Sequence, residues 1–107
     1  MKVVLLQSAE TDMKNLGRYI VKNFGMDIWL TSYGKLKDSV AMIQKHPQVG
    51  RISPELESLN IAQYRQVLSG MNRIVYEQRG DTAYIHIVCD TKRDLQGLLM
   101  KRIVNSS

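Results

Sequence analysis

The fold is decided by residues 51–94, which read RISPELESLNIAQYRQVLSGMNRIVYEQRGDTAYIHIVCDTKRD. Apolar and polar residues alternate in three segments of this stretch, residues 62–68, 73–78 and 82–89. A period of two residues predicts strands that bury one face. Arg79-Gly80-Asp81 joins the last two segments and is typical of a tight hairpin turn. The stretch therefore predicts a three-stranded antiparallel meander.

Two helices are predicted before this stretch, because apolar residues recur there every three or four positions. The first spans residues 9–24, with Ser8 as its N-cap. The second follows Gly25, is capped by Asp27 and ends at His46, which precedes a proline. The short link between the helices predicts an antiparallel hairpin. The two apolar stripes comprise Ala9, Met13, Leu16, Ile20 and Phe24 in the first helix and Trp29, Tyr33, Leu36, Val40 and Ile43 in the second.

Glycines inside both predicted helices indicate how closely the helices approach each other. Gly17 and Gly34 lie at interior positions, where glycine costs about 1 kcal/mol relative to alanine. A close helix–helix contact is the simplest physical reason for such a residue. We therefore expect the two helices to meet closely at both positions.

The chain ends are predicted to complete one α+β domain, residues 1–107. Residues 2–7 form a short apolar strand that joins the sheet, and residues 48–60 form a loop. A last helix is expected after Asp90 or Thr91, either of which can cap it. The order β-α-α-β-β-β-α indicates an N-terminal strand, an antiparallel helical hairpin, the meander and a C-terminal helix. The predicted buried residues of that helix are Leu95, Leu98, Leu99 and Ile103, with Val104 as a further candidate.

Charge and composition limit the function classes. Fifteen basic residues outnumber ten acidic ones, and the net charge of +5 favours an acidic partner, protein or nucleic acid. A mildly basic, solvated surface is the alternative interpretation. The single cysteine, Cys89, excludes an internal disulfide and a paired-cysteine metal site. Because no targeting segment is visible and no apolar run approaches the roughly 20 residues that cross a bilayer, we expect a cytoplasmic protein with no membrane partner.

Metal, cofactor and nucleophile chemistry find little support. His46, His86 and Cys89 are the soft metal ligands, and no phosphate-binding or dinucleotide-binding glycine motif is present. His86 and Cys89 stand three positions apart on one predicted strand, so they should point to opposite faces of the sheet. We therefore expect no metal and no cofactor, with Cys89 a half-buried strand residue and His86 an ordinary one rather than a general base.

Arginines supply the remaining candidate site. Arg65, Arg73 and Arg93 come from two strands and the closing turn, and could converge on one side of the sheet. Arginine binds phosphate or carboxylate with two parallel hydrogen bonds, although exposed arginines often form only surface ion pairs. RNA cleavage would also need a group that takes and gives a proton. The nearby candidates for that group, which could equally be half-buried sheet aromatics, are Tyr64, Tyr76 and Tyr84.

These features resemble the ParE/RelE superfamily of toxins from bacterial type II toxin–antitoxin operons. The resemblance covers nearly the whole chain, and the order and spacing of its motifs are more specific than any one of them. The motifs lie in the opening helix, in the loop after the helical hairpin, and in the strands with their closing turn. They are Ser8-Ala9-Glu10-Thr11-Asp12-Met13 with Arg18-Tyr19-Ile20, Pro47 with Gly50-Arg51 and Pro54-Glu55-Leu56, Tyr64-Arg65, Arg73-Ile74-Val75-Tyr76-Glu77, and Ile87-Val88 through Arg93-Asp94-Leu95.

The superfamily divides by function, and the residues favour one branch. RelE-like members cleave mRNA in the ribosomal A site with lysines, arginines and a late tyrosine, whereas ParE-like members poison DNA gyrase. At the RelE catalytic positions this chain keeps Arg73 and has Arg65 in place of a lysine. Val67 replaces the second lysine, and the region of the late tyrosine holds Leu98 and Leu99. Valine cannot stabilise a phosphate and leucine cannot transfer a proton.

The closer resemblance to ParE implies a non-enzymatic toxin. Such a toxin stabilises the cleaved-DNA complex of gyrase, arrests growth, contributes to plasmid stabilisation and is neutralised by a cognate antitoxin, ParD-like or other. It implies no sequence-specific DNA binding by the toxin alone. The alternative is a RelE-like mRNA interferase with Arg65, Arg73 and Arg93 as catalytic residues, and a third possibility is an interaction module without toxicity.

The resemblance also assigns two surfaces. An acidic, amphipathic antitoxin segment would wrap the helical hairpin and the sheet. We expect its contacts at Trp29, Tyr33, Arg65 and Arg73. The gyrase-binding surface is expected on the closing helix and its flank, where the electrostatic contacts would be Lys92, Arg93, Lys101 and Arg102.

Overall fold

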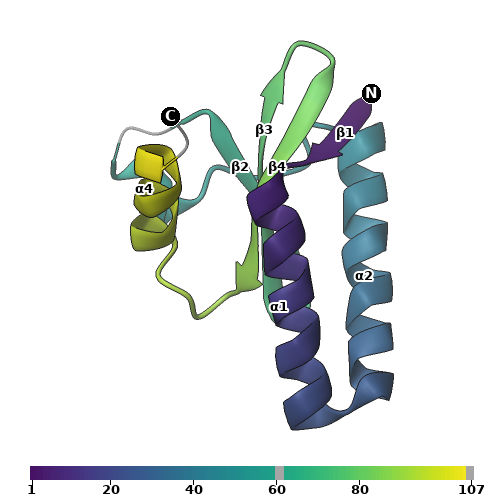
Figure 1. The fold of residues 1–107 in the computed structure, drawn as a ribbon. Coiled ribbons are helices and arrows are strands. Elements are labelled where there is room, and N and C mark those ends of the chain that lie inside the picture. The colour runs from purple at the N-terminus through teal and green to yellow at the C-terminus, as the bar shows by residue number, and fades with distance from the viewer. Residues whose placement is uncertain (60–61, 106–107) are drawn as a thin grey trace.

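The computed structural model describes residues 1–59 and 62–105 and places a four-stranded sheet between two helical layers (Figure 1). The strand order is β1-β4-β3-β2, with β1 parallel to β4 and the other neighbours antiparallel. The predicted α+β class, with its order of elements, is confirmed. The elements are β1 (Lys2–Leu5), α1 (Gln7–Phe24), α2 (Met26–Lys45), α3 (Pro54–Glu57), β2 (Tyr64–Ser69), β3 (Asn72–Arg79), β4 (Thr82–Asp90) and α4 (Leu95–Asn105).

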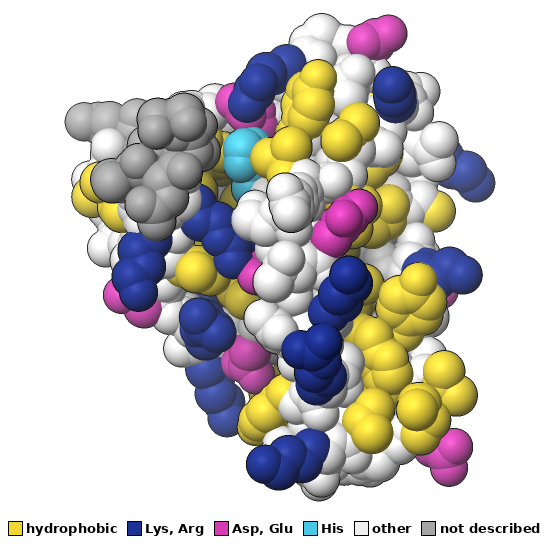
Figure 2. Space-filling view, viewed as in Figure 1, with side chains coloured by type: hydrophobic (Ala, Val, Ile, Leu, Met, Phe, Trp, Pro, Cys, Tyr) yellow, Lys and Arg dark blue, Asp and Glu magenta, His cyan; other side chains and the backbone are white. Residues whose placement is uncertain are grey.

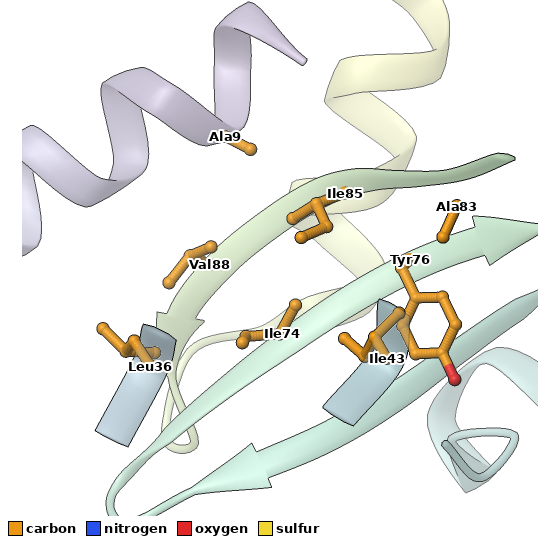
Figure 3. Packing of buried hydrophobic residues seen from close by; sticks show 8 residues of the cluster. All are labelled: Ala9, Leu36, Ile43, Ile74, Tyr76, Ala83, Ile85 and Val88. Atoms are coloured by element: carbon orange, nitrogen blue, oxygen red, sulfur yellow. The ribbon is translucent and has the colours of Figure 1, made fainter. Parts of the chain in front are cut away.

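Two hydrophobic clusters hold the layers together, one on each face of the sheet. Alternate residues of β3 divide between them, because Ile74 and Tyr76 face the α1–α2 hairpin and Val75 faces α4. Burial of each large side chain contributes roughly 1.5–3 kcal/mol, so the period-two pattern fixes both layers. The hairpin-side cluster, drawn in Figure 3, comprises Ala9, Leu36, Ile43, Ile74, Tyr76, Ala83, Ile85 and Val88. The α4-side cluster comprises Leu56, Tyr64, Val75, Ile87, Cys89, Leu95 and Leu99.

Both long helices begin without a side-chain cap, so the two predicted caps are wrong. α1 starts one residue before Ser8, whose hydroxyl donates instead to the main-chain oxygen of His86 at 3.3 Å. α2 starts one residue before Asp27, which therefore lies in its first turn. Gly25, at a φ of 97°, ends α1 and directly precedes α2. A left-handed backbone of this kind favours glycine and allows the abrupt reversal between the two helices.

The two interior glycines of the hairpin have different surroundings. A Cβ at residue 17 would lie 2.9 Å from two carbons of the Trp29 indole, so the predicted close approach is confirmed there. At Gly34 no described atom lies within 4 Å of such a Cβ, and the prediction is wrong at this position. Phe24, which was predicted on the buried face of α1, is exposed at the end of that helix.

The predicted loop after α2 contains a short helix, α3, which the sequence pattern did not indicate. Pro54 occupies its first position, where the missing N–H leaves no donor unpaired. Leu56 is fully buried and adds to the α4-side cluster. A single helical turn with one buried side chain gives no periodic signal, and tertiary packing determines it. The end of the predicted loop, residue 60, lies outside the described residues.

α4 begins later than predicted, because neither Asp90 nor Thr91 caps it. Asp94 does so instead: its Oδ1 accepts the N–H of Gly97 at 3.2 Å. Two of the predicted buried side chains, Leu95 and Leu99, are buried, and Leu98 is half-buried. The predicted burial of Ile103 and Val104 lies outside what the structure describes.

A β-bulge shifts the side-chain alternation in β4. Opposite the step from Val75 to Tyr76 in β3, β4 has one residue more, His86. The His86 ring meets the Tyr64 ring edge-on, with centroids 5.1 Å apart, and Cys89 belongs to the same α4-side cluster as Tyr64. His86 and Cys89 therefore share a face, and their predicted opposite orientation is wrong. An odd spacing implies opposite faces only in a strand without a bulge.

Membrane-spanning helices, metal-binding clusters and a reactive thiol all lack support in the described residues. Within residues 1–59 and 62–105, no helix combines the length and the apolar character that a bilayer crossing needs. The same residues contain no group of three or more His, Cys, Asp or Glu side chains placed to hold a metal ion. The Cys89 thiol is buried, and burial raises its pKa, so the nucleophilic thiolate is disfavoured.

Candidate functional site

Arg73 holds three parts of the fold together. Its side chain is only 6% exposed, and its Nη1 donates to Glu55 Oε1 at 3.0 Å and to Gln66 Oε1 at 3.3 Å. Its Nη2 donates to the main-chain oxygen of Thr91 at 2.5 Å. These contacts join β3 to α3, to β2 and to the turn after β4. The guanidinium is therefore occupied by internal acceptors and is not presented to a phosphate on the surface.

Arg65 lies on the opposite face of the sheet. It pairs in register with Tyr76, which faces the α1–α2 hairpin, and its Nη1 donates to the main-chain oxygen of Gly50 at 2.8 Å. Arg73 faces the α4 side, in line with Val75. Arg93 is exposed in the turn after β4. The structure thus does not bring the three arginines together.

The candidate proton carriers are aromatic residues of the sheet. Tyr76 is fully buried; its hydroxyl accepts the N–H of Gly50 at 2.9 Å and donates to the oxygen of Pro47 at 2.7 Å. Burial raises the pKa of Tyr76 and also that of Tyr64. Tyr84 is half-buried, and the Arg79 guanidinium lies 4.9 Å above its ring. None of the three is placed beside two exposed arginines, as an RNA-cleaving site would need.

A shallow, open groove along the helical hairpin is a candidate binding surface, and we call it the hairpin groove. It has a volume of about 890 Å³. Its floor is apolar, and the Trp29 and Tyr33 rings in it lie 5.4 Å apart. Figure 2 shows exposed hydrophobic side chains gathered over the lower part of the hairpin, with Lys and Arg beside them. The floor comprises Leu5, Met13, Gly17, Val21, Met26, Trp29 and Tyr33.

The rim of the hairpin groove is basic. Lys14, Arg18 and Lys22 follow one another at intervals of four residues on α1, so they lie along one side of that helix. Glu10 is the single acidic residue among those that line the groove. Trp29 and Tyr33, which the sequence predicted as antitoxin contacts, both line this groove, whereas the three cations were not singled out from the sequence. Their four-residue spacing beside the apolar stripe was the signal that could have identified them.

The four residues predicted as target contacts differ in their exposure and in whether they form an ion pair within the protein. Lys92, Arg93 and Lys101 are exposed. Arg102 is half-buried and forms an ion pair with Asp12, with Nη2 and Oδ1 2.5 Å apart. Lys92, Arg93 and Arg102 line a groove of about 680 Å³ between α1 and the turn that leads into α4. Lys101 lines a separate hollow under α4, together with Arg79 and His86.

A small ion-pair cluster lies beside that hollow. Glu77 Oε1 lies 3.0 Å from His86 Nε2 and accepts a hydrogen bond from Arg79 Nη2 at 2.7 Å. Burial raises the pKa of the Glu77 carboxyl, but the hydrogen bonds from Arg79 and His86 lower it by more, so the net pKa is lowered. The carboxylate is thus held ionised and orients the imidazole. The cluster ties β3 to β4 at the bulge.

Comparison with known proteins agrees with this fold. A model of the family described as "ParE toxin of type II toxin-antitoxin system, parDE" matches residues 3–95. The chain therefore belongs to the ParE toxin family of type II toxin–antitoxin systems. It is similar in fold to a chain of the "Chromosomal ParDE TA system from P. aeruginosa", with a TM-score of 0.72 and 14% identity over 86% of this chain and 97% of that one. A search of curated proteins gave no match.

Proposed function

We propose that an antitoxin segment in the hairpin groove keeps this toxin inactive, and that the free toxin inhibits DNA gyrase by stabilising its cleaved-DNA complex. The observation that carries the first half is the pairing of an apolar floor with a basic rim. An amphipathic helix with acidic residues beside its apolar face complements both features. The structural relative comes from a ParDE system, which supports a ParD-like partner.

The chain carries its own reporter of groove occupancy. Trp29 is the only tryptophan in the sequence, and it lines the hairpin groove in a half-buried position. A segment that covers the groove removes water from the indole, so its fluorescence emission should shift to shorter wavelength on titration with the antitoxin. A saturating titration with no spectral change would place the antitoxin elsewhere.

For the gyrase half of the proposal, support comes from membership of the ParE family and from the exposed cations at the α4 end. Lys92, Arg93 and Lys101 can steer the toxin toward an acidic or DNA-bound target. Expression in bacterial cells should then arrest growth and induce the response to DNA damage. Co-expression of the neighbouring open reading frame should relieve the arrest. Growth that continues normally, despite soluble expression, would favour an interaction module without toxicity.

The alternative, ribosome-dependent mRNA cleavage, has weaker support. Arg73 is bonded to three internal acceptors and Arg65 to a main-chain oxygen. Both would have to be released before they could stabilise a phosphate. The alternative predicts cuts in translated messages that disappear with Arg73→Lys, because lysine keeps the charge but not the guanidinium geometry.

A further inference from the structure

After Ile85, no strand of the described residues neighbours β4 on its β1 side. The parallel pairing of β1 ends where Leu5 meets Ile85, and the Leu6 N–H makes the last ladder bond to the Ile85 oxygen at 3.1 Å. The chain then turns into α1. β4 continues to Asp90, and within the described residues no strand pairs with this part of the edge. An unpaired sheet edge is a site for unwanted pairing and carries polar groups that need partners.

Side chains from two distant helices occupy this edge. Asp12 Oδ2 accepts the main-chain N–H of Val88 at 3.0 Å. Arg102 Nη1 donates to the main-chain oxygen of His86 at 2.6 Å, and the Ser8 hydroxyl donates to the same oxygen. Arg102 also donates two hydrogen bonds to the Asp12 carboxylate, from Nη1 to Oδ2 at 2.8 Å and from Nη2 to Oδ1 at 2.5 Å. One residue of a parallel strand would make the same two contacts, because it donates to one carbonyl and accepts from the N–H two residues later.

We propose that Asp12 and Arg102 together replace a neighbouring strand, closing the β4 edge and fixing α4 to α1. Arg102 is then a positioning residue for the target-binding end, and not itself a target contact; this last step rests on the proposed gyrase function, whereas the edge closure does not. The burial agrees, since the Arg102 and Asp12 side chains are only 19% and 14% exposed. Lys101, next in the chain, is exposed and remains available to a target.

The bulge at His86 explains why side chains, and not a strand, bond the backbone groups at this part of the β4 edge. It shifts the alternation of β4, so that the His86 oxygen and the Val88 N–H both face away from β3 just after β1 has ended. α4 has other anchors, because Leu95 and Leu99 are buried and Gln96 Nε2 donates to Ser58 Oγ at 3.1 Å. Those anchors hold α4 to its own side of the sheet, whereas the bond from Arg102 to Asp12 joins α4 to α1 in the opposite layer.

Amide hydrogen exchange in the full-length protein tests the edge closure directly. Asp12→Ala should speed exchange of the Val88 amide by about tenfold or more, because a buried donor loses its acceptor. Asp12→Asn keeps an oxygen acceptor and should retain more protection. Lys101→Ala removes an exposed cation next to Arg102 in the chain and should change the rate by less than about threefold. If Val88 is protected equally in wild type and both Asp12 variants, the proposal is wrong.

An exchange of the two charges separates edge closure from a simple salt bridge. The double variant Asp12→Arg with Arg102→Asp keeps opposite charges, so a simple ion pair should survive it. Edge closure should not survive, since an aspartate at position 102 is too short to reach from α4 to the β4 edge. We expect Val88 exchange in the double variant to stay about tenfold faster than in wild type. Restored protection would overturn the proposal.

A gyrase assay tests the positioning role. Arg102→Lys keeps the charge but loses the planar fork, so it should weaken gyrase inhibition about as much as Arg102→Ala. A direct electrostatic contact predicts instead that lysine retains most of the potency. Lys101→Ala should reduce potency and leave Val88 exchange unchanged. If wild-type toxin has no effect on gyrase, the proposed function fails, while the exchange measurements still decide the edge closure.

Discussion

The indole of Trp29 lies directly against the backbone of Gly17, so that a Cβ on residue 17 would stand 2.9 Å from two indole carbons. Trp29 therefore holds its place in the hairpin groove because residue 17 has no side chain. Gly17→Ala should displace the ring, cost roughly 1–3 kcal/mol of the free energy of unfolding through overpacking, and weaken antitoxin binding. Urea denaturation and fluorescence titration measure the two effects.

Gly34 supplies the matched control for that substitution. It lies inside the neighbouring helix, where no described atom would contact an added Cβ. Gly34→Ala should raise stability by up to about 1 kcal/mol through helix propensity alone, with antitoxin affinity unchanged. Equal effects of the two substitutions would show that the Gly17–Trp29 contact has no special role.

The hydroxyl of Tyr76 is a buried link between the sheet and the loop after α2. Tyr76→Phe leaves the Gly50 N–H and the Pro47 oxygen without their partner. A buried group that loses its hydrogen bond costs about 1–3 kcal/mol, so the midpoint of chemical denaturation should fall. Tyr19→Phe, at an exposed position, should leave the midpoint unchanged. A Tyr76→Phe protein as stable as wild type would contradict the assignment.

The basic rim of the hairpin groove should govern the rate of antitoxin association. Arg18→Glu reverses one rim charge, and Lys14→Glu with Arg18→Glu reverses two. Each reversal should slow association and reduce its dependence on salt, with about 0.5–1 kcal/mol lost per site. Stopped-flow Trp29 fluorescence at two salt concentrations measures this. Lys45→Glu, at the exposed end of α2, is the control and should have little effect.

The Glu77 cluster predicts a loss of stability in acid. Although burial raises the pKa of Glu77, the hydrogen bonds from Arg79 and His86 outweigh it, so the folded-state pKa lies below the unfolded value. The stabilisation is therefore present above the ordinary glutamate pKa and is lost as the pH falls through the folded pKa. The midpoint of chemical denaturation should therefore decrease as the pH is lowered from about 5 to about 3. Glu77→Gln should flatten that fall; an identical pH profile would rule the contribution out.

The fold was predictable because it depends on periodicity. The three strands of the meander, the helical hairpin and the last helix all follow from apolar residues at intervals of two or of three to four. The places where prediction failed depend on contacts between distant residues. Ser8 could not be recognised as a partner of the His86 oxygen, because the bulge that turns this oxygen outward leaves no mark in a single sequence.

The candidate site was predicted unevenly for the same reason. Trp29 and Tyr33 could be singled out because they belong to the periodic apolar stripe of α2, and both line the hairpin groove. Arg65, Arg73 and Arg93 were candidates to converge on one side of the sheet, but Arg65 and Arg73 lie on opposite faces and bond to internal oxygens. A single sequence shows that Arg73 is present but not that Glu55 and Thr91 already accept its hydrogen bonds. Arg102 was named as a target contact, and its pairing with Asp12 could not be foreseen because it joins residues 90 positions apart.

The most direct test of the proposed function is a cleavage assay with purified DNA gyrase, supercoiled plasmid and this protein. The proposal predicts that supercoiling is inhibited and that linear, protein-linked DNA accumulates with increasing toxin. Addition of the cognate antitoxin, at equal concentration, should restore supercoiling and abolish the linear product. If gyrase supercoils and cleaves DNA as it does without the toxin, over the whole range of toxin concentrations that arrests growth, the gyrase proposal is contradicted.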